Sequence, residues 1–156
     1  MPFEQGPYLS AAFLCEKVLE EKDGVKSVVR IVDRLTHTAV GKMEPFGVPL
    51  SLFIRFKSGH ARGASPLRIN LIKPSGESLP PFQVQVYFEG EEDRGVDLVM
   101  NLTIPIEMEG MYMFEIYLQE ELLTKVPLRI IYMSQIMQTY GPSGGLPPQQ
   151  GPSPGT

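Results

Sequence analysis

The chain has 156 residues, enough for one ordinary domain, and its 42% hydrophobic and 21% charged content is typical of a folded, soluble protein. Its formal net charge of -4 provides no overall positive field, which argues against nucleic acid and anionic membranes as partners. The one cysteine, Cys15, excludes an intramolecular disulfide, and no apolar run approaches the ~20 residues that cross a bilayer.

The first part of the folded chain predicts two strands joined by a tight turn. Residues 11–20 lead to Asp23-Gly24, and this dipeptide supplies the positive φ that a hairpin turn needs. From Val25 to Leu35, apolar and charged residues alternate as in a half-buried strand. A helix is the alternative for residues 11–20, because their apolar side chains also fit one helical face.

The middle of the chain predicts three further strands, at residues 50–56, 67–72 and 83–88. Apolar residues alternate with polar ones in the second and third of these, as they do where one face of a sheet is buried. The connecting segments are rich in glycine, proline and small polar residues, and we expect loops or turns at residues 41–49, 58–66 and 73–77.

The remaining elements complete an all-β pattern. Residues 96–107 alternate over a long strand in which Pro105 indicates an edge or a bulge. Residues 111–118 and 122–132 form the arms of a hairpin. Eight short strands, regularly spaced and without a convincing long helix, predict an antiparallel sandwich.

The C-terminal segment differs from the rest in composition. Between Gly141 and Thr156, ten of sixteen residues are glycine or proline, which leaves too little apolar surface to offset the entropy lost on ordering. We therefore expect a sandwich domain over residues 1–138 and a disordered tail over residues 139–156.

The stretch from Gly110 to Leu118 has two faces with different meanings. Alternation places Tyr112, Phe114, Ile116 and Leu118 on one face, which we expect in the core. Gly110-Met111-Tyr112 resembles a tyrosine corner, in which the tyrosine hydroxyl bonds to the preceding backbone of a sandwich. The other face carries Met111, Met113 and Tyr117, which form a partner site if the face is solvated and ordinary packing if the N-terminal segment or a loop covers it.

Three segments, FLCEKVLEEKDGVKSVVRIVDRL, RFKSGHARGASPLRINLIKPSGE and GMYMFEIYLQEELLTKVPLRIIY, carry a resemblance to known proteins. In element order the chain resembles a family of small bacterial proteins of unknown function with an immunoglobulin-like or C2-like sandwich. The resemblance implies an all-β fold, an antiparallel immunoglobulin-like β-sandwich of about 7–9 strands. It implies no activity, cofactor or site residue.

No complete catalytic set is present in the sequence. His37 and His60 lie in polar segments, Cys15 falls in an alternating apolar strand where a thiol is usually buried and inert, and there is no Gly-x-Ser-x-Gly motif. A zinc site would need further ligands at recognisable spacing. We expect no enzymatic activity, no cofactor and neither catalytic nor metal-binding residues.

Two charged groups leave alternatives open. The acidic run Glu89–Asp93, helped by Asp97, either holds calcium, as end loops of C2-type sandwiches do, or is a solvated loop. A basic group, free of intervening acids, either gathers at one end of a hairpin to meet an anion or only balances that loop; its members are Arg55, Lys57, His60, Arg62 and Arg68.

The sequence as a whole indicates a non-enzymatic structural or protein-interaction module. Its partner would be a protein of unknown identity, contacted by Met111, Met113 and Tyr117 or by the basic group, and an edge strand would also allow two copies to pair. The alternative is a sandwich that binds calcium or an anion at its end loops. The N-terminus lacks the basic segment and apolar run of a signal peptide, so we expect a cytoplasmic location.

Overall fold

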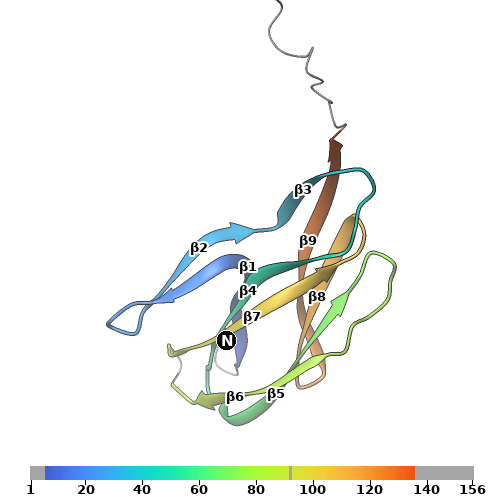
Figure 1. The fold of residues 1–156 in the computed structure, drawn as a ribbon. Coiled ribbons are helices and arrows are strands. Elements are labelled where there is room, and N and C mark those ends of the chain that lie inside the picture. Colours follow the sequence, from blue (N-terminus) through green and yellow to red (C-terminus); the bar gives the residue numbers. More distant parts are fainter. Residues whose placement is uncertain (1–5, 92, 136–156) are drawn as a thin grey trace, which may run out of the picture.

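The structure is a computed structural model that describes residues 6–91 and 93–135, and this part of the chain forms strands and no helix (Figure 1). The strands are β1 (Tyr8–Glu20), β2 (Lys26–Val32), β3 (Arg34–Val40), β4 (Phe46–Lys57), β5 (Arg62–Ile72), β6 (Phe82–Glu89), β7 (Gly95–Ile106), β8 (Gly110–Leu118) and β9 (Glu121–Gln135).

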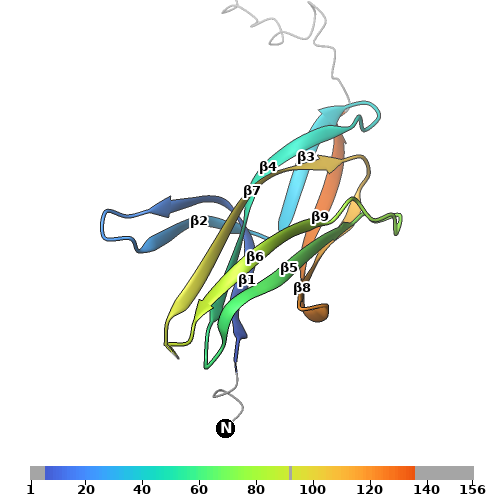
Figure 2. The same cartoon turned by 90° about the horizontal axis from the view of Figure 1, so that it is seen from below.

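The strands form two sheets that face each other, as the view from below shows (Figure 2). The four-stranded sheet has the order β2-β1-β4-β7 and the five-stranded sheet the order β3-β9-β8-β5-β6. Strands β4 and β7 thus occupy the places of strands B and E of an immunoglobulin domain, while β5, β8 and β9 occupy those of C, F and G. The predicted all-β, immunoglobulin-like sandwich is confirmed, and every strand pair is antiparallel except β3 with β9.

The described residues form nine strands where the sequence predicted eight, because one predicted strand is divided into two. Residues 25–35 were expected to form one strand, but the chain leaves the four-stranded sheet after Val32 and joins the other sheet at Arg34. The carbonyl of Asp33, at the crossing, accepts a hydrogen bond of 2.9 Å from the backbone N–H of Arg129. The helical alternative for residues 11–20 is wrong, because they belong to β1.

Two predicted loops are shorter than expected because cross-strand pairing extends the neighbouring strands. β4 begins at Phe46, which lies opposite Ile106 of β7, and β5 begins at Arg62, which lies opposite Glu89 of β6. The predicted edge position of Pro105 is confirmed, since β7 is the last strand of its sheet. Proline is tolerated there because an edge strand leaves half of its N–H groups unpaired.

The core lies between the sheets and is built by alternate residues of each strand. All four residues expected there from β8, namely Tyr112, Phe114, Ile116 and Leu118, are buried. The rings of Phe56 and Phe88 meet edge to face across the sheets, with centroids 5.9 Å apart. This geometry matches the electrostatic preference of aromatic pairs and joins β4 to β6.

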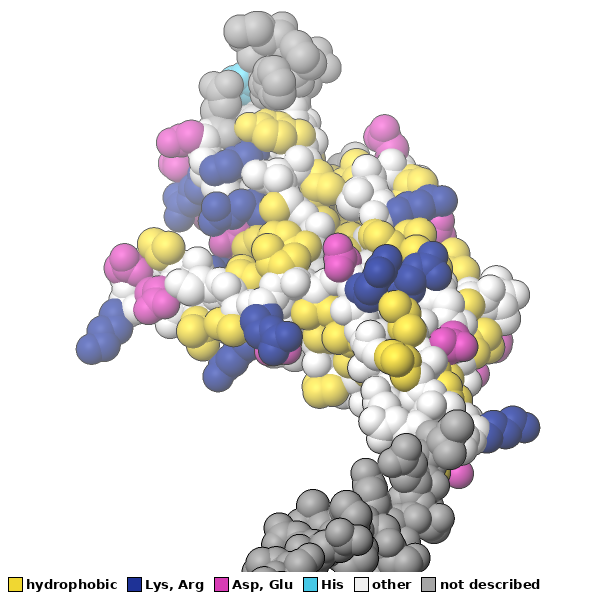
Figure 3. Space-filling model, turned by 90° about the horizontal axis from the view of Figure 1, so that it is seen from above, with side chains coloured by type: hydrophobic (Ala, Val, Ile, Leu, Met, Phe, Trp, Pro, Cys, Tyr) yellow, Lys and Arg dark blue, Asp and Glu magenta, His cyan; other side chains and the backbone are white. Residues whose placement is uncertain are grey.

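The hairpin of β1 and β2 projects from the sandwich (Figures 1 and 2). Its tip, residues 20–23, carries charged side chains, which stand out at the end of this arm in the space-filling view (Figure 3). Four hydrophobic residues of the hairpin are exposed: Leu19, Val25, Val29 and Ile31. An ion pair of 3.6 Å between Lys26 and Asp97 joins the hairpin to β7.

Two expectations concern the ends of the chain and membranes. The predicted tail over residues 139–156, and the boundary at residue 138, lie outside the described residues. Within the residues that are described, no helix has the length and apolar character to span a membrane.

Candidate functional site

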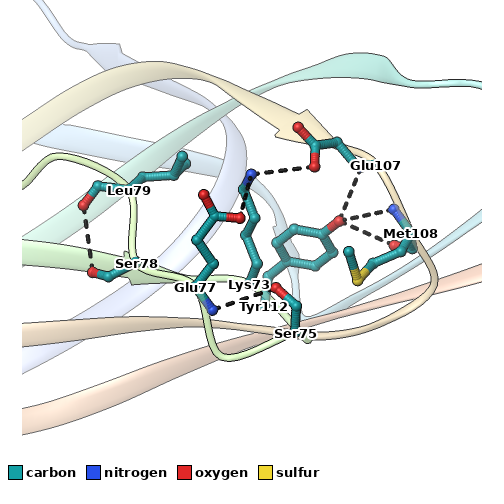
Figure 4. A network of polar contacts seen from close by, with 8 residues as sticks. All are labelled: Lys73, Ser75, Glu77, Ser78, Leu79, Glu107, Met108 and Tyr112. Atoms are coloured by element: carbon teal, nitrogen blue, oxygen red, sulfur yellow. Dashed lines mark hydrogen bonds and ion pairs between the residues drawn. The ribbon is translucent and has the colours of Figure 1, made fainter.

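Strand β8 begins at a tyrosine corner, as the sequence predicted (Figure 4). The Tyr112 hydroxyl accepts hydrogen bonds from the backbone N–H groups of Glu107, at 3.0 Å, and Met108, at 3.2 Å, and donates one of 3.0 Å to the carbonyl of Met108. Gly110 has a φ of 128°, and a Cβ at this position would lie 2.8 Å from the Cβ of Pro74. The corner therefore requires glycine, and its polar groups are satisfied internally.

Lys73 lies beside the tyrosine corner, at the same end of the sandwich (Figure 4). Only 7% of its side chain is exposed, and its ammonium group lies 3.2 Å from the Glu107 carboxylate and 3.6 Å from that of Glu77 (Figure 4). The hydrogen bond to Glu107, followed by the charges of both carboxylates, raises the pKa of Lys73 despite the opposing effect of burial. These contacts connect the turn after β5 to the corner before β8, so their role is architectural.

The opposite side of β8 faces outward from the five-stranded sheet and forms the candidate site, which we call the methionine face. Met111 lies opposite Arg129, and Met113 lies between Ile72 and Pro127. Glu115 lies between Asn70 and Lys125, and Tyr117 lies opposite Arg68; these residues complete the face.

The methionine face is partly shielded, but by its own sheet. Met111, Met113 and Tyr117 are half-buried, and their cross-strand neighbours are residues of β5 and β9. This partial burial lies between the two alternatives drawn from the sequence. The three side chains have packed flanks and remain partly accessible from solvent.

Arg68 and Tyr117 form the most specific contact on this face. The guanidinium carbon of Arg68 lies 4.3 Å from the centroid of the Tyr117 ring, a cation–π geometry, and one terminal nitrogen donates a 3.0 Å hydrogen bond to Glu120. The Nε–H group of Arg68 is buried and has no hydrogen-bond partner among the described residues. Beside it is a cavity of about 400 Å³ lined by polar side chains, including Gln83, Gln85 and Glu120.

The hairpin on which the predicted basic group depended is not formed. The expected gathering required β4 and β5 to form a hairpin, but they belong to different sheets. Arg55 binds Asp97 with a bond of 2.6 Å, and the Lys57 ammonium donates a 2.8 Å bond to the Asp93 carbonyl. His60 is exposed in the loop before β5 and Arg62 begins that strand, whereas Arg68 lies on the methionine face.

Much of the charge of the acidic run is matched by cations. Arg94 lies 2.7 Å from Glu89 and 3.5 Å from Glu91. Burial alone would raise the pKa of Asp97, but the Arg55 hydrogen bond and the charges of Arg55 and Lys26 lower it below its ordinary value. Among the described residues, which omit Glu92, no group of three or more His, Cys, Asp or Glu is arranged for a metal ion.

The residues considered for nucleophilic chemistry occupy structural positions. Cys15 is buried, its thiol lies 3.6 Å from the Ser51 carbonyl oxygen, and burial raises the pKa of the thiol. His37 lies in β3 rather than in a loop, with its ring stacked on Phe46 at a centroid distance of 4.0 Å.

Sequence reasoning missed the pairing of Arg68 with Tyr117, although it singled out both residues. Each belonged to a different candidate group, and the contact depends on the alignment of β5 with β8. It also missed Ile72 and Pro127, which flank Met113. No local pattern reveals such neighbours, because cross-strand partners are set by sheet order and register.

Several solved structures match this chain in part. A crystal structure of an immunoglobulin-like protein (PA1606) from Pseudomonas aeruginosa matches with a TM-score of 0.43 and 14% identity, over 81% of this chain and 98% of that one. The CARDB domain of the PF1109 protein from Pyrococcus furiosus, solved with di-metal ions, matches with a TM-score of 0.38 and 14% identity, over 83% and 97% of the two chains.

A third structure is the alkylpurine DNA glycosylase AlkC from Pseudomonas fluorescens, bound to DNA with an abasic site analogue. It matches with a TM-score of 0.41 and 10% identity, over 63% of this chain and 27% of that one. At these identities and TM-scores the three neighbours say nothing about what this chain binds.

The sequence itself places the chain more directly. No curated protein matches it. Residues 10–131, most of the chain, match the model of one family. The chain therefore belongs to DUF6941, a family of unknown function.

Proposed function

We propose that this protein is a non-enzymatic interaction module that binds a protein partner through the methionine face. The observation that carries the proposal is the pair Arg68 and Tyr117, stacked at 4.3 Å, with Met111 and Met113 half-buried farther along the same outward face of β8. Tyrosine, arginine and methionine are enriched where protein partners meet, and tyrosine and arginine dominate the residues that contribute most to affinity.

Pre-organisation supports this assignment. Tyr117 is held by Arg68, and Met113 is flanked by Ile72 and Pro127, so a partner would meet side chains that have already lost much of their freedom. The Arg68 Nε–H adds a buried donor that lacks an acceptor among the described residues. A carbonyl or carboxylate oxygen of a partner would satisfy this donor once the Arg68 side chain turns its Nε–H toward the adjacent cavity.

The test is a quantitative comparison of partners recovered by the tagged protein from extracts of its own cells. We expect Met113→Asp and Tyr117→Asp each to lower recovery of the same specific partner at least tenfold, because the new carboxylate must be desolvated in the contact. Val25→Asp is the matched control, since Val25 is exposed at the far hairpin and should not alter recovery.

Unchanged recovery with both variants of the face would reject it as the binding site. Circular dichroism and thermal unfolding of every variant establish that a loss of recovery comes from the surface and not from unfolding.

The cellular location belongs to the same proposal. We assign the protein to the cytoplasm, because its one cysteine is a free, buried thiol, which suits a reducing compartment. Fractionation of cells that express the tagged, full-length chain would test this.

A further inference from the structure

Strand β7 is a long open edge. It is the last strand of the four-stranded sheet and has 12 residues, whereas the other edge strands β2, β3 and β6 have 7, 7 and 8. None of the described strands pairs with it on its open side. Edge strands in natural proteins are commonly protected by charge, yet the only charged side chain of β7 is Asp97, which Arg55 and Lys26 neutralise.

Two prolines reveal which backbone groups of β7 face this open side. In an antiparallel pair, opposite residues either exchange two hydrogen bonds or exchange none. Pro105 lies opposite Gly47, and Pro49 lies opposite Thr103, so neither pair can exchange two bonds. The register between β4 and β7 runs without a shift, so every second residue of β7 shares this arrangement.

The backbone N–H and C=O groups of Asp97, Val99 and Asn101 therefore point away from β4. They offer a regular set of donors and acceptors to another extended strand, the arrangement used in recognition by β-strand addition.

The side chains of β7 make the strand complementary to itself. If two copies meet antiparallel about Val99, Asp97 of each lies opposite Asn101 of the other. The Oδ1 atom of Asn101 already accepts a 2.6 Å bond from the Ser51 hydroxyl, so its amide N–H groups remain to donate to that carboxylate. On the inner side, Leu98 of one copy would lie opposite Met100 of the other. Both side chains are only half-buried in a single copy.

We propose that two copies of this chain pair antiparallel through β7, with Val99 opposite Val99, to form one continuous eight-stranded sheet from two four-stranded ones. The paired stretch runs from Gly95 to Thr103 and ends before Pro105, which has no N–H group to contribute. The inference adds a partner to the proposed function and is independent of the methionine face, which lies on the other sheet.

The first test is a cysteine cross-link that reads the register. Val99→Cys places two cysteines opposite each other at a Cα distance of about 5.5 Å, within disulfide range. Asn101→Cys is the matched control, because its two copies would be offset by four residues, roughly 13 Å along the strands. We expect mild oxidation to give a covalent dimer with the first variant and none with the second, while the native Cys15 remains buried.

The second test is the mass in solution of the full chain, by light scattering over a range of concentrations. We expect a shift toward twice the 17.4 kDa of one copy as concentration rises. Val99→Pro removes an N–H that faces the open edge, not a bond to β4, and should raise the dimer dissociation constant by about tenfold or more. Val99→Thr keeps the N–H and should leave that constant close to the native value.

A single copy at every concentration, equal cross-linking of the two cysteine variants, or a dimer that survives Val99→Pro would each overturn the proposal. Should Val99→Pro unfold, the pair of cysteine variants still decides the question.

Discussion

Strand β8 carries two tyrosines on opposite faces, and they differ in almost every physical respect. Tyr112 is fully buried, and its hydroxyl makes three hydrogen bonds to backbone groups. Tyr117 is half-buried, and its hydroxyl donates a weak bond of 3.4 Å to the Glu115 carboxylate, while the Arg68 guanidinium stacks on its ring. Among the described residues, the polar group of the inner face is fully hydrogen-bonded at Tyr112, whereas the outer face includes the buried Arg68 Nε–H, which has no acceptor.

The largest expected difference between the faces comes from removing apolar volume. Phe114→Ala should lower the free energy of unfolding by about 3–5 kcal/mol, because the Phe114 ring is fully buried and its removal leaves a cavity. Met113→Ala on the outer face should cost only about 1 kcal/mol. Urea unfolding of both variants measures the difference, and comparable losses would mean that the outer face is also structural.

The two hydroxyl groups provide a finer comparison. Tyr112→Phe should cost about 1–3 kcal/mol, since it leaves the N–H groups of Glu107 and Met108 without their acceptor near the end of the core. Tyr117→Phe should change the free energy of unfolding by less than about 0.5 kcal/mol. Equal destabilisation in thermal unfolding would contradict a structural role for the first tyrosine alone.

The outer side of the other sheet tests whether outward-facing polar contacts contribute to stability at all. Asp97→Asn should cost about 1 kcal/mol at neutral pH, a modest value because Arg55 is partly exposed. The lowered pKa of Asp97 makes its contribution fully present above the ordinary aspartate pKa and lost as pH falls through the lower, folded value.

The stabilities of the native protein and Asp97→Asn should therefore converge in acid. Urea titrations from pH 7 down to about pH 3 measure this approach. Glu16→Gln is the control, because its pair with Arg30 is exposed and should contribute nothing measurable. If the difference in free energy of unfolding between the native protein and Asp97→Asn grew as the pH fell, the expected direction of the pH dependence would be wrong.

The smallest expected effect concerns calcium. Because Arg94 already binds Glu89 and Glu91, and Asp97 is held by two cations, about 5 mM calcium should shift the unfolding midpoint by less than about 1 °C. A clear rise in the unfolding midpoint that a chelator reverses would show that calcium binds at the end loops. It would also weaken the contrast between the two faces of β8 as the basis for a binding site.

The sequence was sufficient for the two faces of β8 because alternation and glycine are local signals. Period-two spacing identified Phe114 as core, and Gly110 before Tyr112 predicted the corner. The division of residues 25–35 could not be found in the same way. The role of Asp33 at the crossing depends on the hydrogen bond that its carbonyl accepts from the N–H of Arg129, a residue far away in the sequence.

The candidate site was predictable only in part for the same reason. Met111, Met113 and Tyr117 follow from one strand, whereas their association with Arg68 depends on strand order. For the basic group, sequence reasoning failed in the expected pairing of β4 with β5, because neighbouring strands in sequence need not pair in the sheet. Arg55 and Arg68 lie only thirteen positions apart along the chain, yet belong to different sheets.

The crossing at Asp33 also has a consequence for the order of folding. Strand β3 pairs with β9 across a long separation in the sequence, since Arg34 lies opposite Arg129, 95 positions further along the chain. Closing so long a loop costs chain entropy that local hairpins, such as β8 with β9, do not lose. We expect β3 to pair with β9 only after β9 has joined its sheet. The pairing of β3 with β9, which links the two sheets through Asp33, should therefore be the slowest step of folding.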